Sequence, residues 1–130
     1  MTENRFLIDS SAWVEFFDGT AIGSTVKRIL DNPENECFVC GIVVSEVTSK
    51  LERRGFDSLE HFQAMKTKAT WVEESAEDCH HAGIKHAELK KSISRISYAD
   101  ALLIVLSEKR RMKIVSKDEH LKGKNTLFLR

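Results

Sequence analysis

Short apolar segments alternate with longer amphipathic segments along almost the whole chain. The short segments have the length and composition of buried strands, at residues 5–9, 37–40, 70–73, 112–115 and 126–129. Strands that are separated by helices usually lie parallel in one sheet, and the helices then cover both faces of that sheet. The sequence therefore predicts an α/β fold with three layers, α/β/α, and a mostly parallel sheet of four to five strands.

Capping patterns indicate where the intervening helices begin. Serine–acid pairs with capping-box spacing occur at Ser75–Asp78 and Ser97–Asp100. Ser10 or Ser11 is the expected cap of the first helix, and Asp57 is the expected cap of the fourth. We therefore expect six helices, at about residues 11–18, 20–31, 41–54, 58–68, 76–91 and 98–109.

Length and composition fit one globular domain that spans residues 1–130. The chain is 42% hydrophobic and 31% charged, and 130 residues are enough to close one core without disulfides. No apolar run approaches the roughly 20 residues of a membrane span. The first residues lead directly into an apolar run and lack the pattern of a secretion leader. We therefore expect a cytoplasmic protein with no membrane partner.

Four acidic residues follow or interrupt short apolar runs, namely Asp9, Glu46, Asp100 and Asp118. If these carboxylates lie close together in a buried place, desolvation and mutual repulsion raise their pKa values. A hard divalent cation removes this penalty, and Mg²⁺ and Mn²⁺ prefer oxygen ligands. Asp9 and Asp118 fall at or just past the carboxyl ends of expected strands, where parallel sheets bind ligands. The pattern favours a Mg²⁺ or Mn²⁺ site that acts on phosphates.

Each acid also has an ordinary structural explanation. Asp100 can return a hydrogen bond to Ser97 in a capping box, and Asp118 can close a turn or cap a helix. Glu46 can be a solvated helix acid, and Asp9 can cap its own helix. All four acids occurring in order along one chain nevertheless favours a shared metal site.

Two serines stand close to these acids in the sequence. Ser10 follows Asp9, and Ser116 precedes Asp118 by two positions. Their hydroxyl groups can orient a ligand carboxylate or bind metal-held water, and they can equally cap a helix or close a turn. Both are candidate supports of the site.

Charge is balanced over the chain but unevenly distributed along it. Residues 1–65 carry 11 acidic and 6 basic residues, whereas residues 66–130 carry 9 acidic and 14 basic residues, so the net charges are −5 and +5. Several basic residues between 109 and 124 surround Asp118, as a strip that binds an RNA backbone requires. Solvated helix surface explains the same pattern.

The cysteines and histidines form weaker patterns. Cys37 and Cys40 make a C-x-x-C pair, which with Cys79 and His80 suggests zinc or redox chemistry. Positions i and i+3 of a strand point to opposite faces, so two small buried residues are the favoured interpretation. The remaining histidines lack the spacing of a helical zinc site, and no glycine-rich loop indicates a nucleotide cofactor.

Four stretches of the sequence together resemble the PIN-domain ribonucleases, and within them the VapC-type toxins of toxin–antitoxin pairs. The stretches that contain the four acids are residues 6–13, 45–47, 96–104 and 114–118. Their order and spacing agree with the family from residue 5 to the end of the chain. Leu121 is a departure, because the family usually has Phe at this place after the last acid. The change alters packing beneath the loop and leaves Asp118 in place.

The resemblance implies an activity and partners. It implies that Asp9, Glu46, Asp100 and Asp118 bind one or two Mg²⁺ or Mn²⁺ ions and that the enzyme hydrolyses RNA, leaving 5′-phosphate and 3′-hydroxyl ends. It also implies a homodimer that a cognate antitoxin protein inhibits by lying in the active-site groove. A PIN nuclease of ribosomal-RNA maturation and a catalytically inert PIN-fold interaction module are the alternatives.

Overall fold

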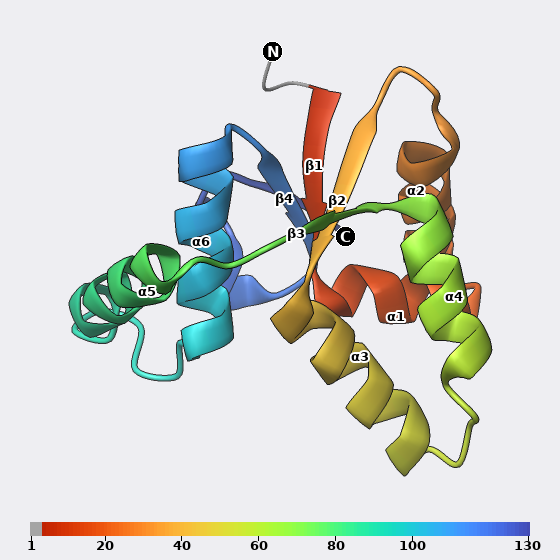
Figure 1. Cartoon of the computed structure of the whole chain (residues 1–130), viewed down its shortest axis with the longest axis horizontal. Helices are drawn as coiled ribbons and strands as arrows, with labels where there is room; N and C mark the ends of the chain where they lie inside the picture. Colours follow the sequence, from red (N-terminus) through yellow and green to blue (C-terminus); the bar gives the residue numbers. More distant parts are fainter. Residues whose placement is uncertain (1–3) are drawn as a thin grey trace.

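The computed structural model describes residues 4–130, which form a parallel five-stranded sheet with helices on both sides (Figure 1). The strands are β1 (Arg5–Ile8), β2 (Glu36–Cys40), β3 (Thr70–Val72), β4 (Lys113–Ser116) and β5 (Thr126–Phe128). Their order in the sheet is β3-β2-β1-β4-β5, and every neighbouring pair is parallel. The predicted α/β fold with a largely parallel sheet is confirmed.

Six α-helices connect the strands of the described part of the chain, and a 3₁₀-helix follows β4. They are α1 (Ser10–Asp18), α2 (Ala21–Asp31), α3 (Gly41–Arg53), α4 (Leu59–Lys68), α5 (Ala76–Leu89), α6 (Tyr98–Arg110) and the 3₁₀-helix η2 (Glu119–Leu121). Helices α5 and α6 lie on one side of the sheet, and α1, α2 and α4 lie on the other (Figure 1). Helix α3 contacts α1 and α4.

Two sequence expectations concern membranes and secretion. Within residues 4–130, no helix is both long enough and apolar enough to cross a membrane. Residues 1–3, on which the expected lack of a secretion leader partly depends, lie outside the described residues.

The direction of the chain switches at the centre of the sheet. From β1 the chain moves to β2 and β3, and it later returns to place β4 against the other edge of β1. In this arrangement Leu7 lies opposite Phe38 on one side and opposite Ile114 on the other. Ligands of such sheets bind at the carboxyl ends of the strands beside the switch. The residues that follow β1 and β4 therefore meet at one edge.

The central strands are buried because helices cover both of their faces. Leu7, Ile8 and Ile114 are fully enclosed, which explains why these strands read as continuous apolar runs. Trp13 of α1 is also fully enclosed, and its indole stacks on Phe17 with 5.9 Å between ring centroids. This core fixes the positions of the segments that follow β1 and β4.

Two expected helix caps lie one or two residues from the observed ones, and at α1 the structure has the alternative cap, Asp9. Helix α1 is capped by Asp9, whose Oδ1 accepts a hydrogen bond from the amide of Ser10 at 2.7 Å, and not by Ser10 or Ser11. At α4, Asp57 accepts from the amide of Leu59 at 3.0 Å but lies one position before the N-cap. Because several neighbouring polar residues can accept from a helix N-terminus, sequence places caps only to within a residue or two.

A buried acid, Asp78, joins α5 to α6. Its carboxylate accepts hydrogen bonds from Lys109 at 2.6 Å and from Arg110 at 3.3 Å, and it closes the predicted capping box with Ser75. The hydrogen bond from Lys109 is the main cause that holds the pKa of Asp78 well below its ordinary value, and the Ser75 amide is the next. Two cations of the predicted basic strip thus stabilise a helix pair.

Helices α1 and α2 approach each other closely at Gly23. A β-carbon at this position would lie 2.0 Å from the carbonyl oxygen of Glu15 and 2.7 Å from its carbonyl carbon. Both are backbone atoms of a packed helix, so they cannot move aside as a flexible side chain can. Only glycine fits at this crossing.

We predict that Gly23→Ala destabilises the protein by about 2 kcal/mol, because the added methyl group forces α2 away from α1. Gly83→Ala is the matched control, since Gly83 lies inside α5 and its β-carbon would meet nothing within 4 Å. The control should stabilise the protein by about 0.5 to 1 kcal/mol through helix propensity. Urea unfolding measures both variants, and equal free energies of unfolding would contradict the close approach.

Candidate functional site

The carboxyl end of β1 positions the first candidate acid, Asp9. Its backbone amide donates to the carbonyl oxygen of Val115 in β4 at 3.0 Å, which extends the pairing of the two strands by one residue. Asp9 is only 4% exposed, and its carboxylate lies at the start of α1. The acid is therefore held between the two central strands and the helix that follows.

Hydroxyl groups surround the Asp9 carboxylate. Its Oδ2 accepts from the hydroxyl of Ser116 at 2.6 Å and from the hydroxyl of Ser11 at 3.1 Å. The Ser116 hydroxyl also accepts from the amide of Asp118 at 2.9 Å, so one buried side chain links two candidate acids. Ser116 was predicted as a support of the site, whereas Ser11 was not, because only the turn into α1 brings its hydroxyl to this carboxylate.

Asp100 lies in the first turn of α6, where it forms the predicted capping box with Ser97. The Ser97 amide donates to Asp100 Oδ2 at 3.2 Å, and the Asp100 amide donates to the Ser97 hydroxyl at 3.0 Å. Oxygen or nitrogen atoms of Asp100, Asp118 and His120 also lie within 4.8 Å of one another. The capping box uses Oδ2 only, so capping and metal binding do not exclude each other.

The turn after β4 brings Asp118 and His120 to the same place. Asp118 caps η2 by accepting from the amide of His120 at 2.9 Å. The His120 Nδ1 atom lies 3.5 Å from Asp118 Oδ1 and 3.7 Å from Asp100 Oδ2. Leu121, which departs from the family pattern, is fully buried in this turn. His120 was not predicted as a site residue, and its position two residues after Asp118 is the only sequence signal for it.

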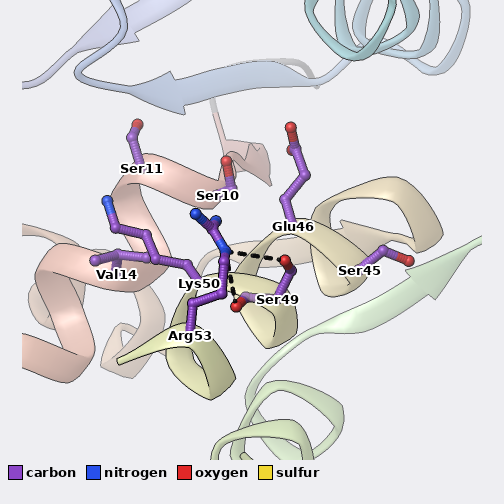
Figure 2. Close-up of a pocket in the computed structure, with 8 residues that line it drawn as sticks. All are labelled: Ser10, Ser11, Val14, Ser45, Glu46, Ser49, Lys50 and Arg53. Carbon is purple, nitrogen blue, oxygen red and sulfur yellow. Dashed lines mark hydrogen bonds between the residues drawn. The ribbon is translucent and has the colours of Figure 1, made fainter. Parts of the chain in front are cut away.

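Glu46 lies in the second turn of α3, at the exposed rim of the acid cluster. Its carboxylate lines a pocket with Ser10 and Ser11 (Figure 2). Desolvation is the main cause that raises the pKa of Glu46, and the charge of Asp9 is the next, while the Ser10 hydroxyl opposes the rise. The charges of Asp9, Asp100 and Asp118 thus all act on Glu46, whereas the group whose ligand atoms lie within 4.8 Å of one another consists of Asp100, Asp118 and His120.

The pKa values of Asp9 and Asp100 are raised as well. Desolvation is the largest cause for both carboxyl groups, and the charge of Asp118 adds to both. The Ser116 hydroxyl opposes the rise at Asp9, and the Ser97 amide opposes it at Asp100. Four carboxylates from four separate segments therefore lie close enough to repel one another.

This donor set suits a hard divalent cation. The ligand-capable atoms of Asp100, Asp118 and His120 are close enough together for one ion to contact all three. The raised pKa values of the acids indicate that cationic side chains of the protein do not compensate their charge. The residues thus fit the Mg²⁺ or Mn²⁺ ion that the sequence predicts.

Cys37 and Cys40 belong to a different environment. Both are free thiols buried on β2, and burial raises their pKa values to about 11 and about 12. Thiols with such pKa values are poor metal ligands and poor nucleophiles at neutral pH. The interpretation of this C-x-x-C pair as two small buried residues is confirmed.

The fold and the acid cluster define a parallel α/β protein with a carboxylate site at its switch point. The model of the PIN domain family matches residues 6–125, a span that includes all four candidate acids. The protein therefore belongs to the PIN-domain family, which confirms the resemblance seen in the sequence. A comparison with curated proteins found no match.

Solved structures with this fold include toxins and their complexes. VapC20 of Mycobacterium tuberculosis, a Sarcin-Ricin loop cleaving toxin, has a TM-score of 0.72 and 17% identity over 96% of this chain and 98% of that one. A toxin–antitoxin complex of Klebsiella pneumoniae has a TM-score of 0.70 and 14% identity, and the match covers 90% of each chain. VapBC2 of Rickettsia felis, bound to a DNA fragment from its promoter, has a TM-score of 0.68 and 14% identity. The match covers 95% of this chain and 96% of that one. At these identities the similarity establishes the fold.

We predict that Glu46→Gln raises the melting temperature of the metal-free protein at pH 7.5 by about 2 to 4 °C, because it removes one repelling charge. The raised pKa means that the folded state binds more protons than the unfolded state. The stability of the folded state therefore falls as the pH rises from 4.5, the ordinary pKa of Glu, through the raised pKa of Glu46. The gain should therefore be absent below pH 4.

Differential scanning calorimetry in EDTA measures this gain at both pH values. Glu34→Gln is the control, because Glu34 is exposed in the turn before β2, and its melting temperature should equal that of the wild type. A lower melting temperature for Glu46→Gln at pH 7.5 would contradict mutual repulsion in the cluster.

We also predict that Ser116→Ala weakens Mn²⁺ binding by about 10- to 100-fold, because Asp9 and Asp118 lose the hydroxyl that links them. Ser107→Ala is the matched control, since Ser107 is equally buried but bonds to Ile104 and Asn125. Both variants should lose stability, and only Ser116→Ala should shift the Mn²⁺ dependence of the melting temperature. Equal shifts in the two variants would refute this role.

Proposed function

We propose that the protein is a metal-dependent endoribonuclease that hydrolyses RNA phosphodiesters and serves as the toxin of a type II toxin–antitoxin system. The observation that carries the proposal is the meeting of Asp9, Glu46, Asp100 and Asp118 at the switch point of the sheet. Membership of the PIN-domain family supports it, because the matched span, residues 6–125, contains all four acids.

In the proposed mechanism the four acids hold Mg²⁺ or Mn²⁺, and His120 is a further donor beside Asp100 and Asp118. Such an ion, when bound to these residues, would supply an acidified water molecule and positive charge beside the scissile phosphate. Ser116 and Ser11 keep the Asp9 carboxylate in one orientation through their hydrogen bonds. A rigid ligand set favours one reaction geometry, because no energy is needed to reorganise it during hydrolysis.

The structural neighbours support the toxin role and its partners. The Klebsiella pneumoniae complex contains a toxin with its antitoxin, and VapC20 cleaves the Sarcin-Ricin loop. We infer by analogy that this protein acts on RNA in the cytoplasm, forms a homodimer and binds a cognate antitoxin. An antitoxin segment that enters the acidic site would inhibit by excluding the ion or the RNA.

We predict that the purified protein cleaves total RNA with Mg²⁺ or Mn²⁺, but not with EDTA, and leaves 5′-phosphate ends. Asp9→Asn should lower the cleavage rate by about 100-fold or more, because loss of a metal ligand costs at least as much as loss of a supporting hydrogen bond. Gel time courses give the rates, and end mapping of the fragments identifies the chemistry.

Asp57→Asn is the matched control for the substitution, and Asp9→Asn itself excludes a contaminating nuclease. Asp57 is an exposed acid outside the cluster, and asparagine can keep its hydrogen bond to the Leu59 amide, so this variant should be fully active. Cleavage that survives EDTA or Asp9→Asn would refute the metal mechanism. Mn²⁺ binding without cleavage would favour an inert interaction module, and cleavage restricted to ribosomal-RNA precursors would favour a maturation nuclease.

A further inference from the structure

A second feature, the α3 pocket, adjoins the acid cluster and has a different chemical character. This pocket of about 470 Å³ is lined by Ser10, Ser11, Val14, Ser45, Glu46, Ser49, Lys50 and Arg53. Figure 2 shows the charged ends of Lys50 and Arg53 extending from α3 toward the side where Ser10 and Ser11 lie. The pocket therefore combines two cations with several hydroxyl groups, and it shares only Glu46 with the acid cluster.

The two cations of the α3 pocket have no acidic partner in the described part of the chain. Neither Lys50 nor Arg53 forms an ion pair within residues 4–130. Other cations near the site are engaged, since Lys117 pairs with Glu15 at 2.9 Å and Arg54 pairs with Asp18 at 3.0 Å. Lys50 and Arg53 are thus available to bind an external anion.

Arg53 is oriented by its own helix. Its Nε donates to the carbonyl oxygen of Ser49 at 3.2 Å and to the hydroxyl of Ser49 at 3.3 Å. These bonds use the inner edge of the guanidinium group and leave its two terminal nitrogens for another acceptor (Figure 2). An arginine held in this way matches the geometry of phosphate oxygens.

The opposite wall of the pocket consists of hydroxyl groups. Ser10 and Ser11 form the first turn of α1, whose N-terminus is capped by the Asp9 carboxylate. Ser11 additionally donates to Asp9, so the wall of the pocket is bonded directly to the acid cluster. An anion in the pocket would lie next to whatever the acid cluster binds.

We infer that the α3 pocket is a phosphate-binding subsite that holds the RNA strand next to the scissile phosphate. This inference rests on the proposed function, since it takes RNA as the substrate. Four carboxylates repel a polyanion, and cations placed beside them offset that repulsion where the strand enters. A single strand carries a phosphate at every nucleotide, so a strand with one phosphate at the acid cluster presents a neighbouring phosphate to Lys50 and Arg53.

The test measures RNA binding separately from cleavage. A fluorescein-labelled 15-nucleotide single-stranded RNA is titrated with full-length protein by fluorescence anisotropy, with Ca²⁺ in place of Mg²⁺, and gels verify that the RNA stays intact. Lys50→Ala/Arg53→Ala should raise the Kd about tenfold, because charge-assisted hydrogen bonds to phosphate are lost. The slope of log Kd against log salt should fall by about 1.

Lys27→Ala/Arg28→Ala is the matched control. It removes one lysine and one arginine near the end of α2, which leads into the amino end of β2 at the edge of the sheet opposite the acids, and should keep the wild-type Kd and salt slope. The Mn²⁺-induced rise in melting temperature should be the same in all three proteins, which shows that the acid cluster is intact.

The outcomes separate the subsite from the proposed function. Cleavage by the wild type together with an unchanged Kd and salt slope in Lys50→Ala/Arg53→Ala would overturn the subsite and leave the nuclease. A wild type that does not cleave RNA, but whose Kd and salt slope depend on these two cations, would keep the subsite and overturn the nuclease. If the control variant loses as much RNA affinity as Lys50→Ala/Arg53→Ala, the loss follows from net charge alone and the subsite is overturned.

Discussion

The hydrogen bond from Ser116 to Asp9, at 2.6 Å, joins the ends of the two central strands, and the candidate site is arranged around it. Strand pairing continues through the Asp9 amide to Val115, so the acid belongs to the rigid sheet and not to a loop. The same Ser116 hydroxyl holds the Asp118 backbone. Because Ser116 belongs to β4, its buried hydroxyl fixes the positions of Asp9 and Asp118 relative to the sheet.

The acid cluster is electrostatically unfavourable in the metal-free chain. Asp9, Glu46 and Asp100 all have raised pKa values because the fold desolvates them and places them near one another. Burial of the apolar residues of the central strands and of α1 must offset this repulsion. Groups of titratable residues held at such a cost typically mark functional sites. Lys50 and Arg53 of the α3 pocket form no ion pair within residues 4–130, and they extend this interpretation from the binding of an ion to the proposed binding of RNA.

Local sequence patterns predicted much of the candidate site. Some of its residues have both a structural role and a place in the acid cluster. Asp100 caps α6 as expected from Ser97-x-x-Asp100, and it also lies in the cluster, so a capping interpretation does not argue against function. The cap of α1 was misplaced by a residue, because Asp9 and the serines after it all suit an N-cap. His120 was missed because its ring reaches Asp100 only after the η2 turn has formed.

The sequence by itself determined the strands, the helices and the identity of the four acids, because hydrophobic period and capping depend on neighbours along the chain. Only the tertiary structure decided which charges face the site. Lys109 and Arg110, close to Asp118 in sequence, bind Asp78, whereas Lys50 and Arg53 of the acidic half line the pocket beside Glu46. The physical reason is that charge pairing depends on distances between packed elements, which strand order sets and local sequence does not encode.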